Sequence, residues 1–246
     1  MLELRNVCKR FLAVTAVDNV SFSARPGEVT GYLGPNASGK STTMKMITGL
    51  METTSGKILF GGKAIEDNLV AYKQLMGYVP EEPHLYSHLS GWEYLVMVGQ
   101  LRNLPAKMTA DCIDGLLRLF SLHGDRHAPI SAYSKGMRQK VLISAALLHN
   151  PDLLLLDEPF SSLDNPLRLE MRRCLARVIR EEIRVPTILV THDILEAYTL
   201  AERVLIYANG RVVQSGRPEM VFNNPVNDEV SSLVSLKNLY PGYIFT

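Results

Sequence analysis

Cysteine is scarce in this chain. The 246 residues include three cysteines, Cys8, Cys112 and Cys174, which lie far apart and form no CxxC pair. The sequence therefore indicates neither a zinc site nor a disulfide framework. Cys112 and Cys174 fall beside apolar positions at helical spacing, and we expect both thiols to be buried.

Long apolar runs and an excess of one charge are also missing. No stretch approaches the roughly 20 consecutive apolar residues that a membrane-spanning helix needs. The segment MLELRNVCKRF carries acidic and basic residues, so we do not expect a signal peptide. Lys+Arg total 26 against Asp+Glu 25, which argues against coating nucleic acid by charge alone, and no nucleic-acid partner is expected. We expect a soluble protein in a reducing compartment, with any membrane part supplied by another chain.

Apolar runs of strand length alternate with helical patterns along the chain. Strands are expected at residues 2–7, 17–24, 29–33, 57–60, 77–80, 153–157, 187–191 and 204–207. Helices are expected at residues 40–50, 167–178 and 194–201, and a block at 90–122 is helical throughout. A further helix carries an apolar stripe formed by Met137, Val141, Ala145 and Leu148. This alternation predicts a parallel sheet flanked by helices, with the helical block as an inserted subdomain.

The segment GPNASGKS, from Gly34 to Ser41, fits the phosphate-loop pattern G-x-x-x-x-G-K-[ST]. Such a loop curls so that successive backbone N–H groups point at one phosphate group, and the dipole of the following helix favours the same anion. Lys40 adds a positive charge near the outer phosphates, and the hydroxyl of Ser41 is placed to ligate Mg²⁺. A structural glycine turn would not explain the lysine, so we expect nucleotide binding.

Polar residues follow two later strands. Asp157 and Glu158 end the apolar run LLLLDEP, and His192 follows the strand at 187–191. An acidic pair at a strand end is more often simply solvated, and a lone histidine is usually a surface or core residue. Ligands of open parallel sheets, however, bind at the carboxyl ends of the strands. Beside a phosphate loop, Asp157 is expected to hold Mg²⁺ through its water shell, Glu158 to reach the attacking water, and His192 to face the γ-phosphate.

Four segments stand in order along the chain: GPNASGKS, YSKGM, LLLLDEP and VTHD. Together they resemble the nucleotide-binding ATPase subunit of ATP-binding-cassette (ABC) transporters, and the resemblance covers about residues 2–225. It implies an α/β fold: a P-loop NTPase core with a mostly parallel sheet, an N-terminal antiparallel β subdomain and an inserted α-helical subdomain. It places the ATPase domain at 1–225, with the core at 1–85 and 150–225 and the helical subdomain at 86–149. Residues 226–246 are then a C-terminal tail.

The resemblance also implies which residues bind ATP and Mg²⁺. Phe11 matches the aromatic residue that stacks on adenine, and an ordinary apolar residue is the alternative. The expected phosphate contacts are Gly34, Pro35, Asn36, Ala37, Ser38, Gly39, Lys40, Ser41 and Thr42, together with Ser134 and Gly136 of the YSKGM segment. Ser41, Glu81 and Asp157 are expected to bind Mg²⁺. Glu158 is expected to act as the general base, and His192 to hold the γ-phosphate and the attacking water.

The YSKGM segment stands where the family usually has LSGGQ. Its SKGM form looks like the subfamily that powers ABC-2-type exporters. The resemblance implies that Ser134 and Gly136 face ATP held by a second subunit, in a head-to-tail dimer of identical or paralogous chains. It further implies an integral membrane permease as partner, a place on the cytoplasmic face of the cell membrane, and a permease-binding groove shaped by residues 83–89.

Two residues depart from the family pattern. Ala37 stands where glycine is usual, so the loop either adopts an angle that alanine permits or carries modest strain. Glu81 stands where the family usually has a glutamine whose amide oxygen ligates Mg²⁺. A carboxylate also ligates Mg²⁺, with added charge, and we expect Glu81 to remain a metal ligand and coupling residue.

Two other functions share the phosphate loop. An ATP-gated ABC-type clamp or regulatory module would usually carry two cassettes, a long coiled coil or a nucleic-acid-binding insertion. A P-loop kinase would need a pocket for a small-molecule substrate and usually lacks a YSKGM segment. The sequence favours an ATPase subunit of an exporter over both.

Overall fold

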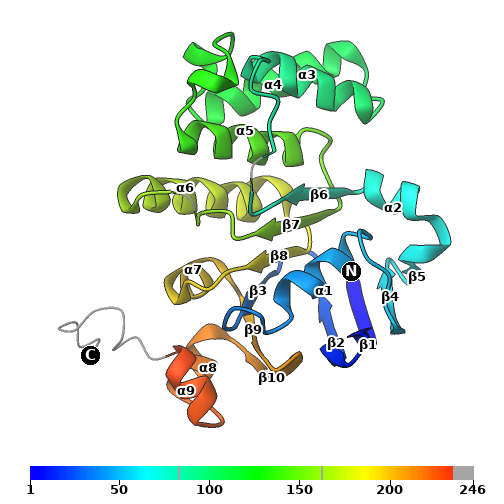
Figure 1. Cartoon of the computed structure of the whole chain (residues 1–246). Helices are drawn as coiled ribbons and strands as arrows, with labels where there is room; N and C mark the ends of the chain where they lie inside the picture. The colour runs from blue at the N-terminus through cyan, green and yellow to red at the C-terminus, as the bar shows by residue number, and fades with distance from the viewer. Residues whose placement is uncertain (83, 162, 235–246) are drawn as a thin grey trace. The chain divides into compact units, whose positions relative to one another are not determined.

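The computed structural model describes residues 1–82, 84–161 and 163–234, and the chain forms two compact units (Figure 1). The first unit consists of Met1–Leu69 and Pro186–Thr246, and the second of Val70–Val185. The mixed α/β fold expected from the sequence is confirmed. The predicted division into core, helical subdomain and tail has other bounds than these units and stays a prediction.

An antiparallel sheet opens the first unit. Its strands lie in the order β2-β1-β4-β5, and their bounds are Leu2–Phe11 for β1, Val14–Ala24 for β2, Ser55–Phe60 for β4 and Lys63–Ala64 for β5. Val7, Val17 and Val20 are buried on β1 and β2. β-Branched residues of this kind favour a pleated surface that is half buried.

A second group of strands in this unit carries the phosphate loop. β3 (Val29–Leu33) pairs in parallel with β8 (Thr187–Val190) and with β9 (Arg203–Ala208), and β10 (Arg211–Gly216) is antiparallel to β9. Every residue of β3 and β8 is buried, as expected for strands covered on both faces. The helices of the unit are α1 (Lys40–Ile47), α7 (Ile194–Leu200), α8 (Pro218–Asn223) and α9 (Asp228–Val234), with a 3₁₀ turn η1 at Ile65–Asn68.

The second unit joins two parallel strands to a group of helices. β6 (Met76–Val79) pairs in parallel with β7 (Leu153–Asp157), and α5 packs against β6. The helices are α2 (Leu69–Gln74), α3 (Gly91–Leu101), α4 (Ala106–Leu119), α5 (Lys135–Leu147) and α6 (Asn165–Arg177). Short helical turns lie at His123–Asp125 (η2), Ile130–Ala132 (η3) and Val178–Ile183 (η4, a π-helix).

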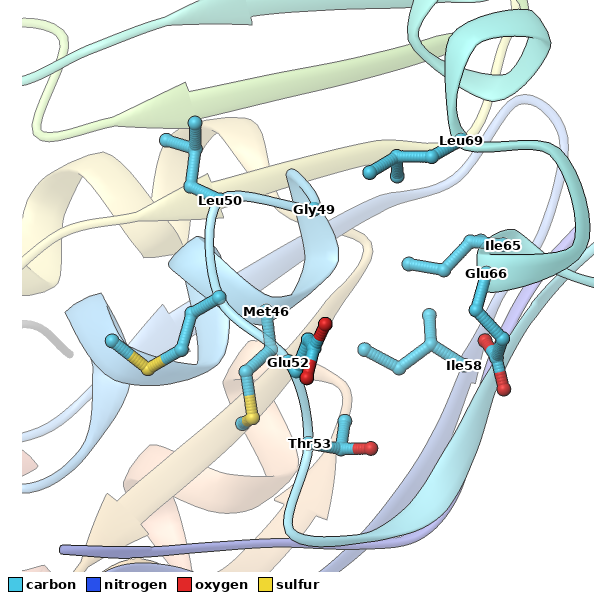
Figure 2. Close-up of a pocket in the computed structure, with 10 residues that line it drawn as sticks. Met46, Gly49, Leu50, Glu52, Thr53, Ile58, Ile65, Glu66 and Leu69 are labelled. Carbon is cyan, nitrogen blue, oxygen red and sulfur yellow. The ribbon is translucent and has the colours of Figure 1, made fainter.

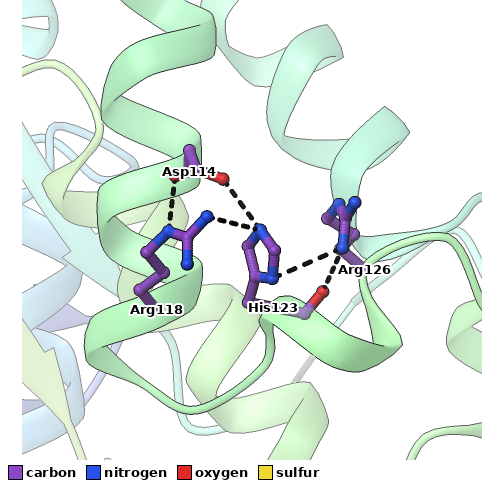
Figure 3. Close-up of polar contacts among 4 residues, drawn as sticks. All are labelled: Asp114, Arg118, His123 and Arg126. Carbon is purple, nitrogen blue, oxygen red and sulfur yellow. Dashed lines mark hydrogen bonds and ion pairs between the residues drawn. The ribbon is translucent and has the colours of Figure 1, made fainter.

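A polar cluster ties the end of α4 to the turn that follows it (Figure 3). Nε of Arg118 donates to Oδ2 of Asp114 over 2.7 Å, and Nε2 of His123 lies 2.9 Å from Oδ1 of the same carboxylate. Nη1 of Arg126 donates to the backbone oxygen of His123 over 2.7 Å. The hydrogen bond from Arg118 is the main reason why the pKa of Asp114 lies below its ordinary value. The cluster joins the last turns of α4 to η2 through polar contacts.

Several predicted element bounds are wrong. The first two strands are longer than expected, and the helix predicted at 40–50 ends at Ile47 because the amides of Leu50 and Met51 both donate back to the oxygen of Lys45. The block at 90–122 is broken between α3 and α4, where Pro105 precedes the first turn of α4. α5 is buried around most of its circumference, so the narrow stripe predicted there describes only part of its buried surface.

Part of the predicted tail, 226–246, is helical. α9 lies in it and buries Val230 and Val234, whereas α8 precedes it, and neither helix was expected. Gln214 of β10 accepts a hydrogen bond from the amide of Val226, which anchors the chain between the two helices. Residues 235–246 lie outside the described residues.

The cysteine prediction is also wrong in part. Cys112 is exposed on α4, and Cys174 on α6 is half buried. Helical spacing placed both cysteines beside apolar positions. On α4, however, Cys112 directly precedes buried Ile113 and already lies on the solvent-facing side of the helix. Within the described ranges, no helix has the length and apolar content needed to cross a bilayer.

Candidate functional site

The phosphate loop follows β3 and leads into α1, as the sequence predicts. Nζ of Lys40 donates to the backbone oxygens of Gly34 (2.7 Å) and Pro35 (2.8 Å), and the amide of Ser38 donates to the oxygen of Pro35. Lys40 is buried, with 6% of its surface exposed. These contacts curl the loop around the ammonium group, which is the arrangement that places backbone N–H groups around a phosphate.

Two residues of the loop adopt left-handed backbone angles. Ala37 has φ 61°, and Gly39, the N-cap of α1, has φ 108°. The loop thus keeps at Ala37 the conformation that glycine provides in the family, and of the two expected outcomes, strain is the one observed. A left-handed alanine costs roughly 1–2 kcal/mol relative to a right-handed one.

The hydroxyl of Ser38 fits an anion ligand. It lies in the loop with 4% of its residue surface exposed, and in the described part of the chain it has no hydrogen-bond partner. Burying a hydroxyl without a hydrogen-bond partner costs free energy. An oxygen of a bound phosphate would accept a hydrogen bond from the Ser38 hydroxyl. Ser41 and Thr42 stand in the first turn of α1, with Ser41 exposed.

His192 follows β8, which lies beside β3. The amide of Thr191 donates to the oxygen of Tyr32 on β3 over 3.0 Å, so the end of β8 is fixed next to the strand that leads into the phosphate loop. The turn is held further by Oγ1 of Thr191, which donates to Oε2 of buried Glu196 and accepts from the amide of Asp193. His192 itself is exposed at the end of the strand.

In the second unit, the parallel pairing of β6 with β7 brings Glu81 and Asp157 to one end of the strand pair. Val79 is the partner of Leu156, so the residues that follow both strands leave the sheet at the same edge. Burial, a hydrogen bond with the carboxylate of Asp157 and the nearby charge of Glu81 raise the pKa of Tyr78 to about 12. Tyr78 is therefore a protonated donor to Asp157, a role that sequence reasoning missed.

Glu158 has an unusual backbone. Its φ is 47°, in the left-handed region, directly after β7 and before Pro159. A residue other than glycine in this region stores strain, and such strain gathers at functional sites. The angle turns Glu158 away from the strand direction that Asp157 follows.

The YSKGM segment begins α5, as the sequence predicts. Oγ of Ser134, the N-cap, accepts a hydrogen bond from the amide of Met137 over 3.2 Å, which leaves its O–H to donate elsewhere. Gly136 is buried, and a Cβ at this position would overlap Cδ2 of Leu167 in α6. A larger residue at this position would therefore displace the side chain of Leu167, apart from any contact with phosphate.

Phe11 ends β1 with 44% of its surface exposed, which leaves the ring face accessible to a flat ligand. Nζ of Lys9 lies 5.3 Å from the ring centroid. The exposure fits both the adenine-stacking prediction and the alternative of an ordinary apolar residue, so the role of Phe11 stays a prediction.

A pocket of about 490 Å³ opens beside α1 in the first unit (Figure 2). Its apolar lining comes from Met46, Leu50, Met51, Ile58, Ile65 and Leu69. The carboxylates of Glu52 and Glu66 lie among these side chains, and Leu50 is 64% exposed. The pocket offers an apolar surface with negative charge beside it.

Each unit, taken by itself, carries oxygen-bearing side chains that the sequence predicts to bind Mg²⁺. Ser41 supplies a hydroxyl in the first unit, and Glu81 and Asp157 supply carboxylates in the second. Hard oxygen donors of this kind are what Mg²⁺ prefers. Within the described residues, no cluster of three or more His, Cys, Asp or Glu side chains is placed to hold a metal ion.

Comparisons with known proteins show the family of the chain. A family model described as ABC transporter matches residues 17–161. The chain is 35% identical over 243 residues to the sulfate/thiosulfate import ATP-binding protein CysA 2 of Shewanella oneidensis, with 97% of this chain and 68% of that protein covered. It is 31% identical over 242 residues to the spermidine/putrescine import ATP-binding protein PotA of Clostridioides difficile, with 98% and 69% covered.

A solved structure of the ATP-binding subunit of an ABC transporter has the same fold. Its TM-score is 0.83 at 31% sequence identity, and 96% of this chain and 99% of that chain are covered. The two relatives above are named as import proteins, so the narrower prediction of an ABC-2-type exporter finds no support in them. The family prediction is confirmed: the chain belongs to the ABC transporter family, as its ATP-binding, ATP-hydrolysing subunit.

Proposed function

We propose that this subunit hydrolyses Mg²⁺-ATP by phosphoryl transfer to water. Lys40 and the loop amides bind the β- and γ-phosphates, Glu158 accepts the proton of the attacking water, and His192 holds the γ-phosphate. Ser41 and Glu81 would bind Mg²⁺ directly, with Asp157 orienting a metal-bound water. The metal supplies charge neutralisation on the phosphate oxygens.

The observation that carries this proposal is the curled loop between β3 and α1. Its buried Lys40, the hydroxyl of Ser38, unpartnered among the described residues, and the left-handed angles at Ala37 and Gly39 support an anion-binding role for the loop. The strained Glu158 after β7 supports the assignment of a general base. A base of this kind contributes about 10²–10⁴-fold to the rate.

We further propose that two subunits bind head to tail, with Ser134 of each closing the site of the other. The O–H of Ser134 is not used by its helix cap, and it can donate to a γ-phosphate oxygen. The partner cassette is either a second copy or a paralogue.

A separate integral membrane permease is the proposed coupling partner, with the subunit on the cytoplasmic face of the membrane. The pocket beside α1 would receive a short cytoplasmic segment of the permease, apolar on one side and basic on the other, because Glu52 and Glu66 border an apolar lining. The loop predicted for the same purpose, 83–89, includes residue 83, which lies outside the described residues.

Export is the proposed direction, on the ground of the SKGM form of the signature. The import names of the relatives favour the opposite direction as the second candidate. Spermidine and sulfate uptake by intact cells decides between them. If cells that carry Glu158→Gln lose uptake of spermidine or sulfate, the export proposal is overturned. If uptake of both compounds is unchanged in those cells, the export proposal is supported.

The ATPase proposal is tested with the full chain. Lys40→Ala should abolish binding of Mg²⁺-ATP, whereas Glu158→Gln should bind ATP, turn over about 10²–10⁴-fold more slowly and accumulate as a dimer. Glu182→Gln, an exposed carboxylate in η4, is the matched control and should behave as wild type. Wild-type turnover in Glu158→Gln would remove the general base. Copurification with nucleic acid or ribosomes, or a phosphorylated small-molecule product, would indicate the clamp or the kinase.

A further inference from the structure

The turn between β9 and β10 lies against the back of the phosphate loop. The amide of Gly210 donates to the oxygen of Ser38 over 2.9 Å, and the oxygen of Gly210 accepts from the amide of Asp18 over 2.8 Å. One residue, Gly210, thus joins the phosphate loop to β2 through its N–H and its C=O, although the three segments are far apart in the sequence.

This junction leaves no room for a side chain. Asn209 and Gly210 have φ of 49° and 76°, which is the left-handed pair expected in a two-residue hairpin turn. A Cβ on Gly210 would lie 2.9 Å from the oxygen of Ala16, and a Cβ on Gly39 would lie 2.5 Å from the same atom. The backbones of β2, the β9–β10 turn and the phosphate loop are therefore in direct contact. We expect a small shift of the turn to displace the loop.

An ion pair fixes the turn to β2. Nε of Arg211 donates to Oδ2 of Asp18 over 2.8 Å, and Nη2 of the same guanidinium donates to the same oxygen. The side chains are 67% and 28% exposed, and exposed ion pairs contribute little to global stability. Arg211 is adjacent to Gly210 in the sequence, and the amide of Asp18 donates to the oxygen of Gly210. The ion pair therefore acts directly on the contact of the turn with β2 and the phosphate loop.

We propose that Asp18, Arg211 and Gly210 form a positioning brace that sets the affinity of the phosphate loop for nucleotide without touching the nucleotide. The brace holds the backbone oxygen of Ser38 through the amide of Gly210, so the loop is already ordered before phosphate binds. Preorganisation of this kind improves binding by removing an ordering cost. The inference rests on the proposed role of the phosphate loop.

The test separates KM from kcat in the full chain. Asp18→Asn and Arg211→Gln should each raise the KM for Mg²⁺-ATP about fivefold, with kcat within about twofold of wild type and an almost unchanged Tm. The charge-reversed double variant Asp18→Arg with Arg211→Asp should recover most of the affinity. Gly210→Ala should raise KM further and also lower Tm, because it strains the turn.

The matched control is the ion pair of Glu3 with Arg5 on β1, which is also exposed and lies 2.6 Å apart in the same unit. Glu3→Gln should leave KM unchanged. An unchanged KM in Asp18→Asn and Arg211→Gln, or an equal rise in Glu3→Gln, would overturn the brace. Lys40→Ala keeps the two proposals distinct. If Lys40→Ala hydrolyses ATP normally, the phosphate-loop assignment fails. If Lys40→Ala is inactive while Asp18→Asn has the KM of wild type, only the brace is refuted.

Discussion

Oγ1 of Thr191 donates a hydrogen bond to Oε2 of Glu196 over 2.6 Å, and both side chains are buried. The same hydroxyl accepts from the amide of Asp193, the residue after His192. Glu196 on α7 therefore holds Thr191 directly and Asp193 through the Thr191 hydroxyl, which restricts where the exposed imidazole of His192 can lie.

Removing that acceptor should reduce turnover more than ATP binding. Glu196→Ala should lower kcat about ten- to a hundredfold, because a small displacement of a positioned group costs this much. Glu196→Gln keeps an acceptor oxygen and should lose less. Thr199→Ala, at an exposed position of the same helix, is the control, and steady-state ATPase assays measure all three. A rise in KM at constant kcat would place the role of Glu196 in binding.

Glu81→Gln should weaken the binding of Mg²⁺ that supports ATPase activity, because it removes one negative charge at the end of β6 beside Asp157. The Mg²⁺ concentration for half-maximal activity should rise, and titration of the metal at saturating ATP measures it. Glu82→Gln changes an exposed neighbouring carboxylate and should leave the titration unchanged. Identical titrations for the two variants would show that the Glu81 carboxylate has no special part.

Ser134→Arg should abolish ATPase activity of the assembled transporter while each subunit still binds ATP. The reason is that a bulky cation at the start of α5 blocks the approach of the second subunit's γ-phosphate. Ser131→Arg, in the exposed turn η3 just before the helix, is the control. Intact hydrolysis in Ser134→Arg would contradict the role in the second subunit's site.

The stability of the protein should fall as the pH falls below about 6.5, and His149 is one cause. Burial, and secondly the positive charge of Arg102, lower the pKa of His149 to about 4. Between pH 6.5 and 4 the unfolded chain binds a proton at this residue that the folded chain does not, so this contribution to stability is full above 6.5 and is lost toward pH 4. One proton gives a slope of at most about 1.4 kcal/mol per pH unit.

Urea unfolding at several pH values measures this slope. His149→Gln lacks the titrating group and should show a shallower fall between pH 6.5 and 4. His84→Gln is the control, since His84 is exposed. Equal slopes in wild type and His149→Gln would show that other groups carry the acid sensitivity.

Local patterns were enough to predict much of the site. The spacing of Gly34, Gly39 and Lys40 predicts a curled loop between strand and helix, because a backbone cradle for phosphate needs those residue types at those positions. The apolar run before Asp157 predicts a buried parallel strand for the same local reason. These expectations depend on neighbours in the chain, and the structure has the corresponding elements as β3, α1 and β7.

Other features depend on residues distant in sequence, and only the tertiary structure decided them. The exposure of Cys112, the hydrogen bond of Tyr78 with Asp157 and the contact of Gly210 with Ser38 each require knowing which segments meet. The sequence by itself determined the family, the chemistry of the loop and the order of the elements. The tertiary structure decided which backbone groups hold that loop in place, because such contacts join segments whose pairing no local pattern records.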